Sequence, residues 1–462
     1  MNGLYAPVRD PLAVRRGLSS LGAVTVGLLL AAALGLALSR YAPTLELAAG
    51  AGVALLAVLA LALSQQEAAA ALGFALLGIV LVEPAPADLV FFVVIAVAVA
   101  TGGIHVHRVS PAAGIVGAFL ALNLVSAVEV VGYERAVTFF ATTAYVSVLA
   151  LWLAGWVTNR PRARVVAGGY IVAATASASL GLAALFLPLP GRELMVFEDR
   201  VQALFKDPNV FGPFLVPAAL ILMEETLTPR LFGLRRILKG FLLLLLTLGL
   251  MFSFSRGAWA NLAVGIGMVL VVMALRRGGG RKVLLAITLG LVAAALVAGA
   301  VSLSGSGDFL ADRARLQSYD ADRFGAQAAG LEPAQRYPFG VGPGQFELVA
   351  PISAHSTYVR VLAEQGLPGF LAFLTLIVFT LGAALANAAA GRDTYGIGSA
   401  ALLGAWCGLL VNSFVIDTLH WRHLWVVAAL IWAGWARRRI ALPRVSQPSE
   451  DRMNGMHKEV GS

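Results

Sequence analysis

Residues 304–366 form a polar interval, rich in ionisable residues, that lies between long apolar runs. Arg323 follows two aspartates in this interval, and His355 begins the run His-Ser-Thr-Tyr-Val-Arg. An imidazole in a polar loop can accept the proton of an alcohol near neutral pH. A guanidinium can bind a phosphate group through two parallel hydrogen bonds. Because charged residues are only 13% of the chain, we expect this interval to hold the chemistry.

A further arginine, Arg256, lies in the run Ser-Phe-Ser-Arg-Gly-Ala-Trp at residues 253–259, where two apolar runs meet. Two interpretations are open for it. It could extend toward lipid headgroups, as arginines at a membrane boundary do. Alternatively, it could hold a phosphate group bidentately, with the small neighbouring residues allowing a ligand to approach the backbone.

A glycine-rich stretch, residues 336–346, precedes the histidine and has three glycines within five residues. Its backbone N–H groups could cradle a phosphate, although such a run is more often a tight structural turn. It lacks the Gly-Lys-Ser/Thr sequence of a nucleotide-binding P-loop. Further along, Glu364 could compete with His355 as the base or form an ion pair with Arg360, four residues earlier.

The elements that must position these residues are membrane-spanning helices. Of the 462 residues, 59% are hydrophobic, and the mean hydropathy of +0.83 exceeds what a soluble domain of this length would show. Continuously apolar runs such as residues 283–301 exclude the alternating pattern of a membrane β-barrel. We therefore predict an all-α, polytopic transmembrane helical bundle with 12–14 spans. The fourteen candidate spans are 18–38, 44–63, 68–82, 89–102, 111–131, 136–157, 165–187, 209–226, 240–254, 257–275, 283–303, 367–388, 397–416 and 423–436.

Lysine and arginine orient this bundle. With the N-terminus in the cytoplasm, the inside segments hold 22 basic residues and the outside segments 12, so both termini are expected to be cytoplasmic. The predicted organisation is transmembrane helices over 1–303, a large outer loop with an amphipathic helix over 304–366, further spans over 367–439 and a disordered cytoplasmic tail over 440–462. Because the basic residues fall in short clusters between spans, the net charge of +9 does not indicate nucleic acid. Outer basic residues, such as Arg200 and Lys206, instead indicate an anionic ligand at the membrane surface.

Taken in order, these segments resemble the O-antigen ligase and polymerase superfamily. The resemblance rests on residues 255–259, on Arg323, on the run Pro-Phe-Gly-Val-Gly-Pro-Gly-Gln-Phe at 338–346, and on residues 355–369. The run Asp-Pro-Asn at 207–209 also resembles an earlier motif of the family. The resemblance covers about residues 200–390, and Ser356 stands where the family usually has asparagine.

The resemblance implies a bundle of the lipid-sugar-dependent glycosyltransferase type, in the bacterial inner membrane, with a periplasmic active site. The enzyme would be inverting and would use neither metal nor cofactor. Its donor would be a glycan on undecaprenyl diphosphate, and its acceptor a sugar hydroxyl on lipid A–core or on another lipid-linked glycan. His355 would be the catalytic base, and Arg256 and Arg323 would bind the diphosphate. The possible accessory residues are Arg200, Arg336, Tyr358, Arg360 and Glu364.

We favour a ligase that attaches O-polysaccharide to lipid A–core. The alternative is an O-antigen or exopolysaccharide polymerase, which would use the same donor and the same kind of base. A lipid-sugar flippase is a rival of a different class, but transporters tend to place ionisable residues at mid-span. In this chain Glu129 lies near the outer end of its apolar run, and Glu224 and Glu225 lie near the inner end of theirs.

Overall fold

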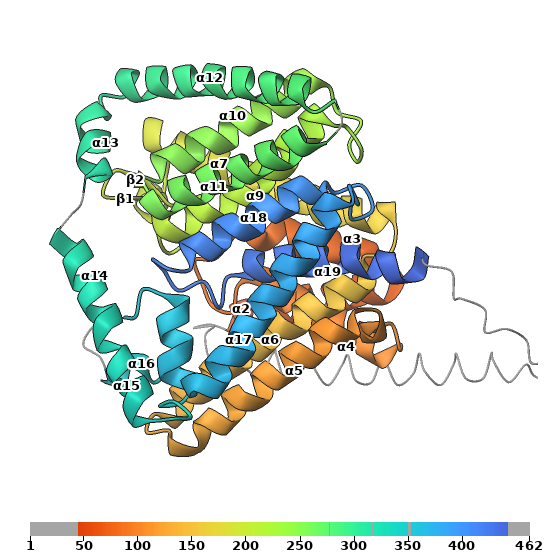
Figure 1. The fold of residues 1–462 in the computed structure, drawn as a ribbon, viewed down its shortest axis with the longest axis vertical. Helices are drawn as coiled ribbons and strands as arrows, with labels where there is room; N and C mark the ends of the chain where they lie inside the picture. The colour runs from red at the N-terminus through yellow and green to blue at the C-terminus, as the bar shows by residue number, and fades with distance from the viewer. Residues whose placement is uncertain (1–44, 277, 316–317, 350–352, 442–462) are drawn as a thin grey trace, which may run out of the picture.

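The computed structural model describes residues 45–276, 278–315, 318–349 and 353–441 (Figure 1). Within these ranges the side chains of 45–49, 129, 314, 318–323, 334, 349 and 438–441 are not described. The helices are α2 (Leu45–Ser64), α3 (Gln66–Ala75), η1 (Leu76–Gly78), α4 (Pro86–Ala100), η2 (Val106–Val109), α5 (Ser110–Val125), η3 (Ser126–Glu129), α6 (Tyr133–Trp156), α7 (Arg160–Phe186), α8 (Arg192–Met195), α9 (Pro208–Leu227), α10 (Arg236–Phe252), α11 (Arg256–Leu275), α12 (Gly280–Leu303), α13 (Gly307–Ala314), α14 (Ser318–Ala329), α15 (Leu331–Arg336), α16 (Phe346–Val349), α17 (Thr357–Ala389), α18 (Ser399–Asn412) and α19 (Arg422–Ala441). Two short strands, β1 (Val196–Phe197) and β2 (Arg200–Val201), form an antiparallel hairpin.

This architecture confirms the predicted all-α, polytopic bundle. Seven of the described helical segments are long and apolar enough to cross a membrane: Val106–Val128, Tyr133–Trp156, Arg160–Phe186, Pro208–Leu227, Arg256–Leu275, Gly280–Leu303 and Thr357–Ala389. Three shorter apolar helices lie at Gly50–Ser64, Pro86–Ala100 and Ser399–Asn412. The predicted span at 18–38 and nearly all of the predicted tail lie outside the described residues, and each of the other thirteen candidate spans overlaps a helix. The total of 12–14 spans stays a prediction.

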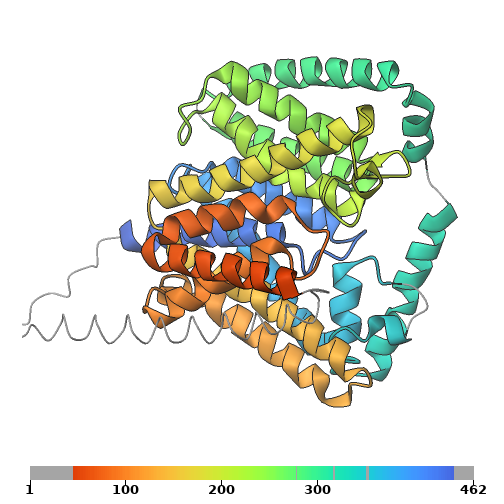
Figure 2. The same cartoon turned by 180° about the vertical axis from the view of Figure 1, so that it is seen from behind.

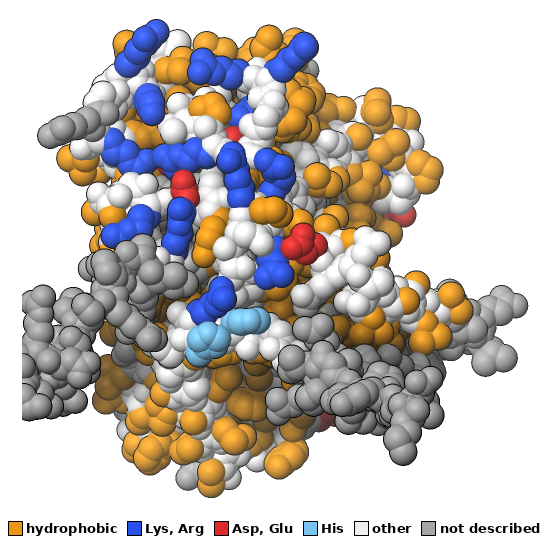
Figure 3. Space-filling view, turned by 90° about the vertical axis from the view of Figure 1, so that its right-hand side faces the viewer, with side chains coloured by type: hydrophobic (Ala, Val, Ile, Leu, Met, Phe, Trp, Pro, Cys, Tyr) orange, Lys and Arg blue, Asp and Glu red, His pale blue; other side chains and the backbone are white. Residues whose placement is uncertain are grey.

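The polar interval lies at one end of the bundle. In Figure 1 the long helices cross the view from left to right, and α13 to α16 form the left-hand edge together with the β1–β2 hairpin. Figure 2 shows the same edge from behind, with α2 and α3 on the near side. The opposite end of the bundle, seen in Figure 3, gathers many lysines and arginines. In the predicted orientation this basic face would be cytoplasmic.

Helices α11 and α18 approach each other through glycines. A Cβ added to Gly404 would lie 2.5 Å from the carbonyl oxygen of Gly265, and one added to Gly408 would lie 2.5 Å from that of Asn261. At the start of α11, a Cβ on Gly257 would lie 2.6 Å from Oδ1 of Asn412. Small residues allow such close backbone contact between membrane helices. The contact fixes the start of α11, and therefore Arg256, against the end of α18.

Helix α17 changes direction at Gly366, which has φ 63° and ψ −171° within an otherwise helical segment. A Cβ at this glycine would lie 2.1 Å from the carbonyl oxygen of Pro338, so the glycine-rich stretch packs directly against the kink. The kink therefore separates the segment before residue 366 from the span predicted to begin at residue 367. The helix itself begins at Thr357, two residues after His355.

Glu224 and Glu225 are buried at the end of α9, where they join neighbouring elements. Glu225 pairs with Lys239 of α10 at 3.2 Å, and Glu224 accepts a hydrogen bond from the backbone N–H of Ala401 in α18 at 2.7 Å. Glu224 also lies 3.3 Å from both Arg230 and Arg276. These two carboxylates therefore stabilise one end of the bundle, in agreement with their predicted place near the end of a span.

Candidate functional site

A two-residue turn places Arg200 at the start of β2. The turn residues Glu198 and Asp199 have φ of 46° and 57°, the pair of positive values that defines the type I′ hairpin turn. Arg200 is only 6% exposed. Its Nε donates to the carbonyl oxygen of Ser253 at 3.0 Å, and its Nη2 donates to Oδ1 of Asn209 at 3.0 Å.

The Asp-Pro-Asn run begins α9 and orients the amide that Arg200 contacts. Asp207 is the N-cap residue, and its Oδ1 accepts a hydrogen bond from the N–H of Asn209 at 2.7 Å. Pro208 occupies the first helical position, which suits its fixed φ and missing N–H. The motif therefore holds Asn209 against Arg200.

Arg256 is the first residue of α11, after the N-cap residue Ser255. The Ser255 side chain accepts a hydrogen bond from the N–H of Ala258 at 3.3 Å. Nη1 of Arg256 donates to the carbonyl oxygen of Arg315, just beyond α13, at 2.9 Å. The helix dipole disfavours a cation at a helix N-terminus. An anion bound there would be favoured by the dipole and by the positive charge of Arg256. The Arg200 guanidinium also contacts the Ser253 carbonyl, so it is joined to the backbone segment that carries Arg256.

His355 lies in a bent segment just before α17. Its φ is +44°, and its carbonyl oxygen accepts a hydrogen bond from Nε2 of Gln327 at 3.2 Å. The next residue, Ser356, donates through Oγ to the carbonyl oxygen of Ser413 at 3.4 Å. Ser413 is the next residue after Asn412, and the Asn412 side chain packs on Gly257 beside Arg256. The segment after α18 therefore contacts the surroundings of both His355 and Arg256.

Arg323 lies in α14, and its side chain is outside the described residues. Gln327, four residues later in the same helix, donates to the carbonyl oxygens of His355 and Phe414, the latter at 3.1 Å. Helix α14 therefore lies against the histidine segment. The predicted role of Arg323 in binding diphosphate stays a prediction.

Residues with strained backbone conformations lie at or near Arg200, Arg256 and His355. Among the described residues, the non-glycine residues with positive φ are Glu198, Asp199, Ala203, Phe254, His355 and Tyr395. Three of these flank Arg200, one lies two residues before Arg256, and one is His355 itself. Such conformations cost about 1–3 kcal/mol each and tend to cluster at functional sites. All but Tyr395 therefore lie within three residues of Arg200, Arg256 or His355.

Glu364 and Arg360 stabilise the glycine-rich stretch. The predicted pair is present, since Nη1 of Arg360 lies 3.0 Å from Oε1 of Glu364. The carboxylate of Glu364 also accepts hydrogen bonds from the N–H groups of Gly344 at 3.0 Å and Phe346 at 3.2 Å. The N–H of Gly342 donates to the Glu364 carbonyl oxygen at 2.9 Å. Because these amides bond within the protein, the stretch is a structural turn rather than a phosphate cradle.

Arg360 is itself buried among several acidic side chains. It contacts Glu347 and Glu364, and its Nε lies 2.8 Å from Oδ2 of Asp417. Partial burial raises the pKa of Glu347, but the hydrogen bond and charge of Arg360 outweigh it and hold that pKa below its usual value. This network joins α16, α17 and the segment after α18, and so supports the chain around His355.

The remaining accessory candidates lie elsewhere. Arg336 is exposed and pairs with Glu332 at 2.6 Å, one helical turn away. The hydroxyl of Tyr358 donates to the carbonyl oxygen of Leu410 in α18 at 3.1 Å. Sequence reasoning did not single out Gln327, which contacts the backbone next to the histidine, because a glutamine in a polar loop carries no distinctive pattern.

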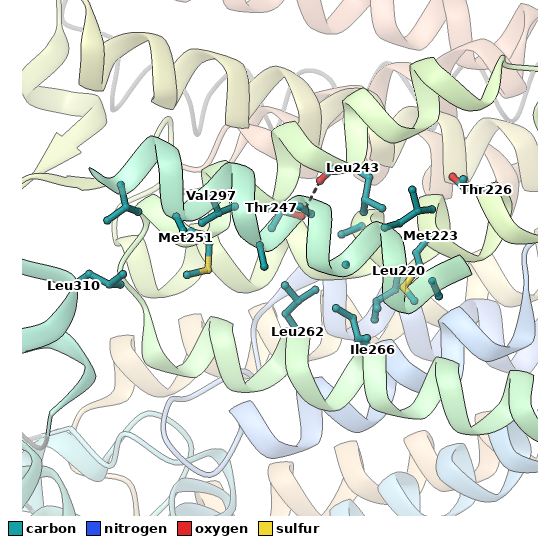
Figure 4. A pocket seen from close by; sticks show the side chains of 18 of the residues that line it. Leu220, Met223, Thr226, Leu243, Thr247, Met251, Leu262, Ile266, Val297 and Leu310 are labelled. Atoms are coloured by element: carbon teal, nitrogen blue, oxygen red, sulfur yellow. Dashed lines mark hydrogen bonds between the residues drawn. The ribbon is translucent and has the colours of Figure 1, made fainter. Parts of the chain in front are cut away.

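An apolar cavity of about 640 Å³ lies between α9, α10, α11, α12 and α13 (Figure 4). Its lining is almost wholly aliphatic and extends from Thr226 at one end to Leu310 of α13 at the other, as Figure 4 shows. Phe309, next to Leu310, packs edge-on against Phe254 with 4.7 Å between ring centroids. The Leu310 end therefore lies near the segment that carries Arg256.

Residues 241–374 match the family model described as O-antigen ligase. The matched segment runs from α10 into α17 and includes Arg256, Arg323 and His355, whereas Arg200 precedes it. No curated protein matches the chain. Residues 241–374 of this multi-pass membrane protein are therefore similar to the O-antigen ligase family.

Proposed function

We propose that this protein transfers a glycan from undecaprenyl diphosphate to a sugar hydroxyl, with lipid A–core as the acceptor. The observation that supports this most is the shared backbone assembly of Arg200, Arg256 and His355. Arg200 contacts Ser253, Arg256 follows three residues later, and the segment after α18 packs on both Gly257 and the residue after His355.

The arginines would act on the leaving group. A lipid diphosphate leaves more readily when its negative charge is balanced, and each well-placed donor of this kind is worth about 2.7–4 kcal/mol. Arg200 and Arg256 are held by the hairpin and by the start of α11, and Arg323 would complete the set from α14. Guanidinium groups suit this task because they form two parallel bonds to phosphate oxygens.

His355 would act on the acceptor. Its imidazole would take the hydroxyl proton as the oxygen attacks the anomeric carbon on the face opposite the diphosphate. One displacement of this kind inverts the anomeric configuration. General-base catalysis by a positioned side chain contributes about 10²–10⁴-fold to the rate.

The apolar cavity would bind part of the polyprenyl chain. Its volume of about 640 Å³ and aliphatic lining suit a hydrocarbon, and its Leu310 end lies near the Arg256 segment. A donor lipid placed there would have its diphosphate at the arginines and its isoprene units between α10, α11 and α12.

The test is transfer by purified protein in detergent, using a synthetic undecaprenyl diphosphate glycan as donor. Lipid A–core and a lipid-linked repeat would be offered separately as acceptors, each with and without EDTA. We expect a lipid A–core product of inverted configuration whose yield is unchanged by EDTA. Polymer formed from the lipid-linked repeat would instead identify a polymerase, and a deletion strain would then accumulate single repeats rather than unlinked polymer. Absence of product with both acceptors would contradict the proposed function.

A further inference from the structure

Two adjoining cavities with several charged residues in their lining lie at the same end of the bundle as the candidate site. The larger, of about 830 Å³, is lined mainly by the start of α6, from Gly132 to Thr142. The smaller, of about 200 Å³, lies between residues 205–214 and residues 417–423. Both are lined by Glu83, His420 and Arg422, so the two spaces share a wall.

These cavities border the segments that carry Arg200 and His355. Lys206 and Val210 of the smaller cavity flank Asn209, the partner of Arg200. Asp417, also in its lining, accepts a hydrogen bond from Oγ1 of Thr357 at 3.3 Å, two residues after His355. A ligand held here would therefore lie beside the proposed base and the proposed diphosphate site.

The cationic side chains in the lining are paired, and this pairing argues against an anionic ligand. Lys206 lies 3.2 Å from Glu83, and Arg422 forms an ion pair with Asp88. Arg135 lies 3.7 Å from Glu347. Paired ions still offer N–H donors and carboxylate acceptors, which are the groups that recognise uncharged hydroxyls.

His420 supplies a defined acceptor to this lining. Its Nε2 lies 2.9 Å from Oγ1 of Thr143, and that hydroxyl donates its own proton to the carbonyl oxygen of Phe139 at 2.9 Å. Nε2 must therefore be the protonated nitrogen, which makes Nδ1 an acceptor. Among the described residues, no side chain or backbone group donates to this Nδ1. Burial lowers the pKa of His420 to about 4, so the ring is neutral at physiological pH.

We propose that these two cavities form the binding site for the acceptor glycan, with Nδ1 of His420 accepting a hydrogen bond from a sugar hydroxyl. This inference rests on the proposed function and adds where the acceptor binds. The exposed ring of Tyr133 and the edge of Trp421 would contact the apolar faces of the sugar rings, as in other sites that combine aromatic surface with a few polar groups. His420 is thus a positioning and specificity residue, distinct from the base.

Two substitutions separate the nitrogens of His420. A glutamine amide can replace Nε2 but not Nδ1, whereas an asparagine amide can replace Nδ1. With delipidated core oligosaccharide as acceptor and saturating donor, we expect His420→Gln to raise the acceptor KM about tenfold, the equivalent of one lost hydrogen bond. We expect His420→Asn to stay within about threefold of wild type. The donor KM and the pH profile of kcat should be unchanged in both.

Tyr133→Ala provides a second variant at an exposed position of the larger cavity, where folding is not at risk. It should also raise the acceptor KM while leaving the donor KM unchanged. His107→Gln is the matched control, because η2 packs at the Trp156 end of α6, away from Gly132. An unchanged acceptor KM in Tyr133→Ala and His420→Gln, with wild-type transfer intact, would overturn the acceptor site and leave the proposed function standing. Equal increases in donor and acceptor KM would also overturn it. Absence of transfer by the wild type would overturn both.

Discussion

Glu364→Gln tests whether this carboxylate stabilises the fold around the site or takes part in the chemistry. In the structure Glu364 is 1% exposed and accepts three hydrogen bonds, from Arg360, Gly344 and Phe346. Glutamine has nearly the same shape but only one accepting oxygen. With that oxygen at the position facing Phe346 and Arg360, the amide nitrogen would face the N–H of Gly344.

The magnitude follows from these contacts. One buried backbone N–H would lose its acceptor, which costs about 1–3 kcal/mol. The two remaining bonds would change from charge-assisted to neutral, and neutral bonds are about half as strong. We expect a total loss of about 2–5 kcal/mol in unfolding free energy. Glu332→Gln is the matched control, since its pair with Arg336 is exposed on both sides and should cost less than about 1 kcal/mol.

The measurement is unfolding of the purified protein by SDS titration, followed by tryptophan fluorescence, beside transfer activity measured well below the transition. We expect Glu364→Gln to unfold at lower SDS and to keep measurable transfer while folded. Wild-type stability with complete loss of transfer would refute the reasoning and assign Glu364 to the chemistry.

Three other outcomes are expected. Arg256→Lys should lower kcat/KM about 10–100-fold, because a point charge replaces a bidentate fork; near-normal turnover would favour an arginine that only extends to headgroups. Gly408→Val should lower the folded yield, since even its Cβ would lie 2.5 Å from the Asn261 carbonyl oxygen. Gly267→Val on α11 should be tolerated, because nothing lies within 4 Å of a Cβ at that position. Equal yields of the two variants in size-exclusion chromatography would contradict this packing argument. EDTA should leave the initial rate of transfer unchanged, and loss of activity restored by a divalent cation would show that the arginines do not suffice.

The helices could be predicted from sequence because lipid selects for continuous apolar runs. Their ends could not, since hydropathy reports the apolar stretch rather than the helix. Helix α7 was predicted from residue 165 but begins at Arg160, where Asn159 caps it and the arginines of its first turns donate to the carbonyl oxygens of Arg230 and Leu231. Similarly, a span was predicted over residues 68–82, but the helical structure there ends at Gly78. The residues after it, Val80 and Glu83, line the smaller of the two adjoining cavities.

Candidate site residues could be named from the sequence, whereas the contacts that hold them could not. Glu198 and Asp199 are not the asparagine–glycine pair that identifies a type I′ turn, so the hairpin that holds Arg200 has no clear sequence signal. His420 follows an apolar run that was included in a predicted span. Its hydrogen bond with Thr143 joins residues that are 277 positions apart in the sequence. Contacts of this kind are set by packing of the whole bundle, which a single sequence does not reveal.

The most direct test of the central claim is His355→Ala, measured for both transfer and donor binding. If the imidazole deprotonates the acceptor while arginines hold the diphosphate, the variant should lose about 10²–10⁴-fold in kcat and bind the lipid diphosphate donor with wild-type affinity. A well-folded His355→Ala protein that transfers glycan at the wild-type rate would contradict the account.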